Sequence, residues 1–378
     1  MLYLDHAATS PVRPEVLAAM GPYLTGVFGN PSSHHTAGES AASALDDARA
    51  RVAQMLGMRT GDVVFTAGGT EANNLAVKGI VLAALATGRR HLVVSPIEHE
   101  SILESAAYLT RFHDVEVTQV PVDRVGRITP VALATAIRDD TALVSIGHAN
   151  NEIGTIQDSV ALAAVARSAG APLHLDAVQS AGWLPLQGLG ADAVSIAGHK
   201  LGAPKGIGAL GVRGRVPLEP LLHGGGQERG RRSGTENVAG AVGLATALEL
   251  AERERETAAA TVGAATTRFI ALVLDAVPEA ELTGDRDHRL PGTASFTFAG
   301  TSGEAVLLEL ERRGVISSSG SACAAGSDEP SHVLLASGVP AEVAQTSVRF
   351  TFGRDALPDD APERLAALVA ESVRAARG

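Results

Sequence analysis

Between about residues 40 and 215, short apolar runs rich in β-branched residues alternate with longer Ala-rich segments. The Ala-rich segments, such as 40–56 and 160–170, suit amphipathic helices, and the short runs suit strands. Strand and helix alternating several times predict an α/β fold, in which helices cover both faces of a mostly parallel sheet. The expected strands lie in the runs 62–68, 91–96, 115–122, 141–150, 172–178, 191–198 and 208–213.

A second pattern follows these runs. Residues 237–276 form one long helical stretch that is interrupted only by single glycines and is suited to linking two domains. We therefore expect a large domain over residues 13–255 and a small domain made of residues 1–12 and 256–378. In the small domain the pattern predicts a strand at 293–300, a helix at 302–314, a strand at 346–353 and a final helix.

Composition narrows the class of protein. A hydrophobic content of 45% with 19% charged residues indicates a globular protein with a large core. A net charge of −11 argues against general binding to nucleic acid or to an anionic membrane. The sequence shows neither a signal peptide nor an apolar run that approaches the ~20 residues of a spanning helix, so we expect a cytoplasmic protein. One cysteine, Cys323, excludes an internal disulfide and a Cys-rich metal site, and no metal is predicted.

The candidate reactive residues lie where the expected strands end. In a parallel sheet these strand ends form the edge at which ligands bind. The stretch FTAGGTEANN (65–74) leads from a strand into a helix, and the N–H groups around Gly69 with the Thr70 hydroxyl would form an anion cup. An ordinary strand–turn–helix corner capped by threonine fits these residues equally well. At the next corner, SPIEHES (95–101), His99 follows a strand, a place where a structural histidine is the commoner case.

Two later strand ends have sharper chemical meaning. Asp176 follows the apolar strand of PLHLDAVQSAG (172–182), with Gln179 three residues later, and a carboxylate there needs a cation or a strong donor. Lys200 follows His199 at the end of another strand, where partial burial would lower the pKa of the amine towards that of a useful nucleophile. The glycine pattern of GIGALG (206–211) leads into a strand rather than a helix, so it predicts no nucleotide site.

Two loops complete the candidates. The loop 224–237 combines glycines, three arginines and Thr235, and is either a solvated basic loop or one that faces a ligand phosphate or a subunit boundary. The stretch SSSGSACAAGS (317–327) places Cys323 in a segment too small-chained and glycine-bearing for a core element.

Together, an anion cup, a buried carboxylate, an imine-forming lysine and a histidine at successive strand ends meet the needs of one cofactor, pyridoxal 5′-phosphate. The lysine forms a Schiff base, the carboxylate keeps the pyridine nitrogen protonated, and the helix N-terminus holds the phosphate.

Ten short motifs follow one another along the chain: LDHAAT, GNPSSHH, GGTEANN, EHESIL, ANNEIGTIQ, HLDAVQ, GHKLGAPKG, GGGQERGRRSGTEN, SSGSAC and VRFTFG. In these motifs and their order the chain resembles the cysteine desulfurases of the class V aminotransferase superfamily of fold-type I enzymes, in the branch that serves nitrogenase and general iron–sulfur assembly. This resemblance implies a large domain with a mostly parallel seven-stranded sheet flanked by helices, and a smaller α+β domain. It also implies conversion of L-cysteine to L-alanine with transfer of the sulfur to an enzyme cysteine as a persulfide.

The resemblance implies roles around the cofactor ring. Lys200 would form the Schiff base, Asp176 would pair with the pyridine nitrogen, and His99 would stack on the ring and transfer protons. Gln179 and Asn151 would contact the ring-hydroxyl side, and Asn151 would also contact the substrate.

It implies further roles for the phosphate and the substrate. Gly69, Thr70 and His199 would hold the phosphate, and Thr235 would reach in from the other subunit of a homodimer. Arg349, in VRFTFG, would pair with the substrate carboxylate through its two-pronged guanidinium group.

The sequence departs from the family at two positions. Ala197 stands where a phosphate-contacting serine is usual, so one hydroxyl donor is missing. Ser195 points the same way along the expected strand and is one conceivable replacement. His6, where asparagine is common, is a milder variation.

Cys323 matches the nucleophile of the family, on a loop at about 317–330 that we expect to be mobile. From Cys323 the sulfur would pass to an acceptor protein, an iron–sulfur scaffold or a thiolation enzyme, and the pathways of iron–sulfur assembly, tRNA thiolation and DNA sulfur modification all stay open. Two other enzymes on the same fold, a selenocysteine lyase and an aminotransferase, are alternatives that need no cysteine in this loop. A non-catalytic sulfur carrier is a third, but it would have no use for Lys200.

Overall fold

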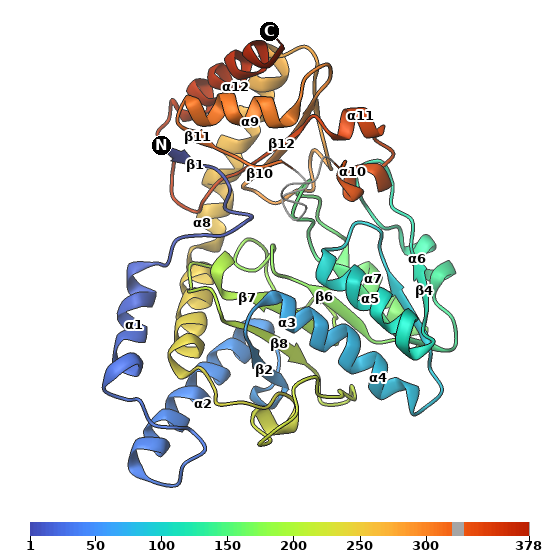
Figure 1. Ribbon diagram of the computed structural model, residues 1–378, viewed down its shortest axis with the longest axis vertical. Helices are drawn as coiled ribbons and strands as arrows, with labels where there is room; N and C mark the ends of the chain where they lie inside the picture. Colours follow the sequence, from blue (N-terminus) through green and yellow to red (C-terminus); the bar gives the residue numbers. More distant parts are fainter. Residues whose placement is uncertain (320–328, 378) are drawn as a thin grey trace.

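The computed structural model describes residues 1–319 and 329–377. Its central sheet has seven strands in the order β2-β8-β7-β6-β5-β3-β4 (Figure 1). β8 runs antiparallel to both of its neighbours, and the other pairs are parallel, which confirms the predicted sheet. Each of the seven predicted runs contains one strand: β2 (Val63–Thr66), β3 (His91–Val94), β4 (Glu116–Gln119), β5 (Thr141–Gly147), β6 (Leu173–Asp176), β7 (Ala193–Ala197) and β8 (Gly208–Val212).

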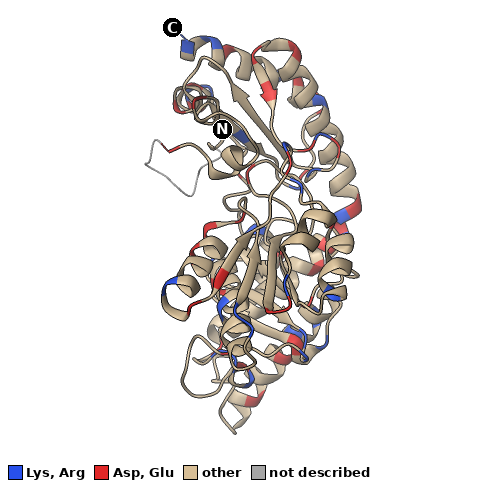
Figure 2. Cartoon of the chain, turned by 90° about the vertical axis from the view of Figure 1, so that its right-hand side faces the viewer, with Lys and Arg blue, Asp and Glu red and all other residues tan. Residues whose placement is uncertain are grey.

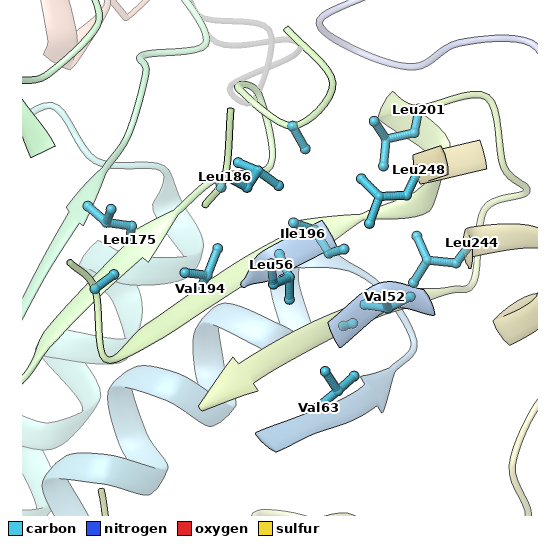
Figure 3. Packing of buried hydrophobic residues seen from close by; sticks show 14 of the residues in the cluster. Val52, Leu56, Val63, Leu175, Leu186, Val194, Ile196, Leu201, Leu244 and Leu248 are labelled. Carbon is cyan, nitrogen blue, oxygen red and sulfur yellow. The ribbon is translucent and has the colours of Figure 1, made fainter. Parts of the chain in front are cut away.

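Helices cover both faces of this sheet, so inner strands such as β5, β6 and β7 are buried on both sides. Figure 3 shows one face, where Val52 and Leu56 of one helix and Leu244 and Leu248 of another pack over Ile196. The helices and short turns of this part are α1 (Pro14–Thr25), α2 (Thr36–Leu56), η1 (Thr60–Asp62), α3 (Gly69–Asn74), η2 (Leu75–Gly79), α4 (Ile80–Leu85), α5 (Glu100–His113), α6 (Pro130–Ala136), α7 (Ser159–Ser168), η3 (Gly198–Lys200) and η4 (Glu228–Gly230).

A second core lies beyond the sheet and is joined to it by α8 (Val238–Ala276), which runs through both parts in Figure 1. Phe269 of α8 makes edge-on contacts with Phe296, Phe350 and Phe352 at 5.3–5.9 Å between ring centroids, so much of the scarce aromatic content gathers here. The remaining elements are β1 (Leu2–Tyr3), β9 (Ala280–Leu282), β10 (Thr293–Phe298), α9 (Gly303–Arg312), β11 (Val315–Ile316), α10 (His332–Ala336), α11 (Ala341–Ala344), β12 (Ser347–Thr351) and α12 (Ala361–Arg377).

The second core is built on an antiparallel sheet in the order β12-β10-β9, with α9 and α12 packed together beside it. β1 pairs with β11 in parallel, which brings the N-terminus to this part of the protein. The strands and helices predicted for residues 293–353 are therefore present, together with the final helix. The domain boundary near residue 255 stays a prediction, since α8 passes through that position without interruption.

By length and composition α8 could cross a membrane, although 33% of its most apolar 18-residue stretch is buried. Its apolar side chains pack into both cores, as those of a core helix do: Leu244 and Leu248 in the first, Phe269 and Val273 in the second. In the view of Figure 2, basic and acidic residues are interspersed along the chain and do not form one basic face.

Candidate active site

A cavity of about 1040 Å³ opens where the parallel strands β2, β3, β5, β6 and β7 end. Loops at these strand ends bring the predicted residues together, because the carboxyl ends of parallel strands meet at one edge of the sheet. Thr235 is exposed and does not line the cavity, and Cys323 lies outside the described residues. The predicted residues that line it are Gly69, Thr70, His99, Asn151, Asp176, Gln179, His199, Lys200 and Arg349.

One wall is the start of α3, which continues through the single π-helical turn η2 into α4. The first N–H groups of the helix, beginning at Gly69, have no partner within it, and no side chain in the described part of the chain caps them. Gly69 is required for space, because a Cβ there would lie 2.8 Å from Val178 Cγ2 and 3.2 Å from the Cβ of Ala197. The wall therefore has the shape and the donors of an anion cup.

The Asp176 carboxylate lies at the end of β6 and is held in place by two donors. The backbone N–H of Val178 donates to Oδ1 at 2.9 Å, and Asn73 Nδ2 donates to Oδ2 at 2.7 Å. Both oxygens are thus oriented, as a carboxylate that pairs with one fixed group requires.

His99 is the N-cap of α5, and its side chain performs the capping. Nδ1 of the ring accepts a hydrogen bond from the backbone N–H of Ser101 at 3.0 Å and lies 2.8 Å from Ser101 Oγ. The ring orientation is therefore fixed by the first turn of the helix.

Lys200 contacts the N-terminal segment, whose residues 7–9 line the same cavity. Its amine donates to the carbonyl oxygen of Ala7 and, at 2.8 Å, to that of Ala8. Gln179 Nε2 donates to the same Ala7 carbonyl at 3.0 Å, so two predicted residues meet at one backbone group. Sequence reasoning missed this wall, because the contact joins residues 193 positions apart.

His199 lies beside Thr9, with Nδ1 3.2 Å from the threonine hydroxyl. Burial, with the nearby positive charges of Lys200 and Lys205, lowers the pKa of His199 to about 4. A neutral imidazole contacts an anion through a hydrogen bond rather than through charge.

Ser195 does not replace the hydroxyl that is missing at Ala197. It is fully buried, does not line the cavity, and its Oγ lies 2.8 Å from Nε2 of His174 on the neighbouring strand β6. The suggestion that Ser195 compensates for Ala197 is therefore wrong, since its hydroxyl is used inside the sheet.

Arg349, on β12, is 2% exposed and reaches the cavity from the second core. Nη1 donates to the backbone carbonyl of Asn151 at 2.9 Å, and Nη2 forms an ion pair with Asp5 Oδ1 at 2.8 Å. Asn150, next to Asn151, instead closes its own turn by accepting from the N–H groups of Glu152 and Ile153.

Of the three arginines of the loop 224–237, Arg229 is exposed, as in a solvated loop, whereas Arg231 and Arg232 are half-buried and have partners in the fold. Arg232 forms an ion pair with Glu71 of α3 at 2.8 Å, and Arg231 donates to the carbonyl groups of Gly61 and Val63. The loop therefore packs along the edge of the sheet and against the helix that begins the anion cup.

Both described flanks of the segment that holds Cys323 are anchored near Arg349. Ser318 pairs with Arg349 through two backbone hydrogen bonds, at 2.7 and 3.2 Å. On the other side, the hydroxyl of Ser331 donates to the buried carboxyl of Glu152. The prediction that the loop is mobile concerns residues outside the described part of the chain.

Sequence reasoning also missed Glu98, a buried carboxyl that lines the cavity. Its Oε1 accepts a hydrogen bond from Ser95 Oγ at 2.5 Å. Burial raises the pKa of Glu98 to about 8, and the negative charge of Asp176 adds to the rise. The sequence signal was its place directly before His99, but the sequence cannot show that this carboxyl is buried.

Glu98 makes the stability of the protein depend on pH. Its carboxyl keeps a proton up to about pH 8 when folded but ionises near 4.5 when unfolded, so the free energy of unfolding falls as pH rises through this window. The buried His148 and His174, whose pKa values are lowered by burial, have the opposite effect, but only below their unfolded value of 6.5. Replacing Glu98 by glutamine should therefore remove the loss of unfolding free energy that wild type shows above pH 6.5.

Urea unfolding at pH 6.5 and pH 8 measures this effect, since these values span the upper part of the window. Between them, the free energy of unfolding of Glu98→Gln should rise relative to wild type by about 2 kcal/mol. Glu104→Gln, at an exposed position of α5, is the matched control and should follow wild type. Equal pH dependence in wild type and Glu98→Gln would contradict the assignment.

Comparison with known proteins identifies the family. Residues 2–361 match the model of the class-V aminotransferases. The cysteine desulfurase IscS of Dictyoglomus turgidum is 44% identical over 354 residues, which cover 93% of this chain and 89% of the relative. A solved NifS-like protein superposes with a TM-score of 0.91 at 33% identity, with 99% of both chains covered.

A structure described as SspA in complex with cysteine superposes with a TM-score of 0.80 at 34% identity, covering 94% of this chain and all of that one. The matches extend over nearly the whole chain and thus include both cores and every described wall of the cavity. The chain therefore belongs to the class-V aminotransferase family, among its cysteine desulfurases.

Proposed function

We propose that this cysteine desulfurase holds pyridoxal 5′-phosphate in the cavity and passes the sulfur of L-cysteine to Cys323, releasing L-alanine. One observation carries the proposal: Lys200, Asp176 and His99 come from the ends of three different strands and line one cavity together with the anion cup. Dependence on this cofactor is general in the family, and the residues present fit it.

The residues that line the cavity suit each part of this cofactor. The cup at Gly69 has free N–H groups and no room for a Cβ, as close approach of a phosphate to the backbone requires. Thr70 and the neutral His199 would add hydrogen bonds to that phosphate. The oriented carboxylate of Asp176 would meet the ring nitrogen, and Lys200 would supply the amine that joins the cofactor covalently.

When bound, the cofactor supplies an electron sink that makes the α-proton and the C–S bond of the substrate labile. The chain provides positioning and proton transfer. His99, fixed by its capping contact, would move protons at Nε2, and Gln179 and Asn151 would hold the ring-hydroxyl side.

Arg349 would bind the carboxylate of L-cysteine as a two-pronged donor, since it reaches the cavity close to Asn151. In the present arrangement Asp5 occupies Nη2, so substrate binding would require the ion pair to loosen or the guanidinium to be shared.

The transfer balances without an added oxidant. The bond from Cβ to sulfur breaks, Cβ takes up a proton, and the sulfur forms a new bond to the Cys323 sulfur, so that L-cysteine and a thiol become L-alanine and a persulfide. Only the thiolate is a good nucleophile, so a base such as His99 would remove the thiol proton. The anchored flanks support this role, because Ser318 pairs with Arg349 and Ser331 with Glu152 on either side of the part of the chain that contains Cys323.

We also propose a cytoplasmic homodimer that delivers its persulfide to an acceptor protein, an iron–sulfur scaffold or a thiolation enzyme. Thr235 is exposed and lies outside the cavity of its own chain, which supports a contact made across a subunit boundary.

Product analysis tests the proposal as a whole. Purified holoenzyme given L-cysteine and a thiol reductant should release alanine and sulfide in equal amounts. An aminotransferase would instead form a keto acid and keep the sulfur on the product. Keto acid formation without alanine would contradict the proposed reaction.

A further inference from the structure

Two buried polar side chains, Asn73 and Ser101, lie between Asp176 and His99 and connect them. Asn73 Nδ2 donates to Asp176 Oδ2 at 2.7 Å and to Ser101 Oγ at 2.9 Å. Ser101 Oγ in turn lies 2.8 Å from His99 Nδ1. Asn73 is 2% exposed and Ser101 7%, so water competes little for these contacts.

The direction of each hydrogen bond follows from chemistry. A carboxylate can only accept, so the nitrogen of the Asn73 amide must face Asp176. Its second hydrogen goes to Ser101 Oγ, and the serine's own proton is then available to His99 Nδ1. The backbone N–H of Ser101 donates to the same Nδ1 at 3.0 Å, so two donors converge on one ring nitrogen.

Convergent donors decide the tautomer of His99. A proton on Nδ1 would have to displace two donors, the hydroxyl and the backbone N–H of Ser101, so the neutral ring carries its proton on Nε2. Each donor contributes part of this preference, so loss of the hydroxyl weakens it. The Asn73 Oδ1 atom is buried and has no partner among the described residues. Such an atom costs stability, so the position is better explained by its two donated bonds than by packing.

We propose that Asn73 and Ser101 are positioning residues. They hold His99 in the Nε2–H tautomer and orient the Asp176 carboxylate towards the pyridine nitrogen of the cofactor. They connect His99, which would stack on the cofactor ring, with Asp176, which would pair with its nitrogen, so the positions of the two side chains are coupled. This inference rests on the proposed roles of His99 and Asp176, and deepens them.

Ser101→Ala tests the tautomer directly. In the NMR spectrum of holoenzyme labelled with ¹⁵N-histidine, the ring nitrogens of His99 should show the chemical shifts of a pure Nε2–H tautomer. The signals of His99 are identified among those of the 12 histidines because they disappear in His99→Gln. In Ser101→Ala the signals should move towards a mixture of tautomers, and kcat for L-cysteine should fall about 2- to 10-fold, the effect of one hydrogen bond, with little change in KM. Ser101→Thr keeps the hydroxyl and should restore both.

Ser105→Ala is the matched control. Ser105 lies one turn further along α5 and is also buried, and among the described residues its hydroxyl donates to the backbone carbonyl of Ser101, at 2.6 Å. It should leave the tautomer and kcat unchanged. Asn73→Ala should alter the visible absorption of the bound cofactor as well, because Asp176 loses one of its two donors, whereas Ser101→Ala should leave that band in place.

Wild-type tautomer and kcat in Ser101→Ala would overturn the inference, as would an equal loss in Ser105→Ala. An unchanged absorption band in Asn73→Ala would overturn the part that concerns Asp176. These results are separate from a failure of the proposed function, which would appear as a Lys200→Ala variant that still turns over L-cysteine.

Discussion

Replacing Lys200 by alanine is expected to abolish desulfuration of L-cysteine and to remove the visible absorption of the purified protein. Lys200 lines the same cavity as the anion cup and Asp176, and its amine donates to the carbonyl groups of Ala7 and Ala8. Without it the cofactor has no covalent attachment, and an amine that can share proton transfer with His99 is gone. Loss of such a group alone costs about 10²- to 10⁴-fold in rate.

This chain allows an unusually clean control, because it has only three lysines: Lys78, Lys200 and Lys205. Lys78 lies outside the cavity with its amine 4.5 Å from the centre of the Tyr108 ring, so Lys78→Ala should keep both colour and activity. Reduction of the holoenzyme with borohydride should fix the cofactor to the peptide that contains Lys200. Recovery of the label on Lys205, which also lines the cavity, would contradict the assignment.

Replacing Cys323 by serine is expected to leave the cofactor spectrum intact while sulfide release falls by about 10²- to 10⁴-fold. The magnitude is that of removing an essential activated group, since a serine hydroxyl is a far weaker nucleophile than a thiolate. Because Cys323 is the only cysteine, alkylation of the whole protein gives an independent test. Iodoacetamide should inactivate wild type to the level of Cys323→Ser and have no further effect on that variant.

The sequence predicted the sheet because its strands are local, apolar and separated by segments of helical composition. It also predicted the strand-end residues, such as Asp176 and Lys200, because a parallel sheet gathers its carboxyl ends at one edge. What it could not predict was the wall built from Ala7 and Ala8, since no spacing rule links them to a lysine 193 positions away.

The sequence also could not predict which polar side chains pair with one another inside the fold. Ser195 pointed the expected way along β7, but its hydroxyl is used by His174 on the next strand, and sequence periodicity does not show which neighbour a side chain meets. Asn73 and Ser101 lie within the motifs GGTEANN and EHESIL, yet their link between Asp176 and His99 exists only once α3 and α5 lie side by side.

The central claim, that sulfur passes from L-cysteine to Cys323, is tested most directly by a single turnover without reductant. Holoenzyme mixed with one equivalent of L-cysteine is quenched and digested, and the mass of the peptide that contains Cys323 is measured together with the alanine released. The account predicts that this peptide gains the mass of one sulfur atom, in proportion to alanine. Alanine formed together with free sulfide, while the Cys323 peptide keeps its original mass, would contradict it.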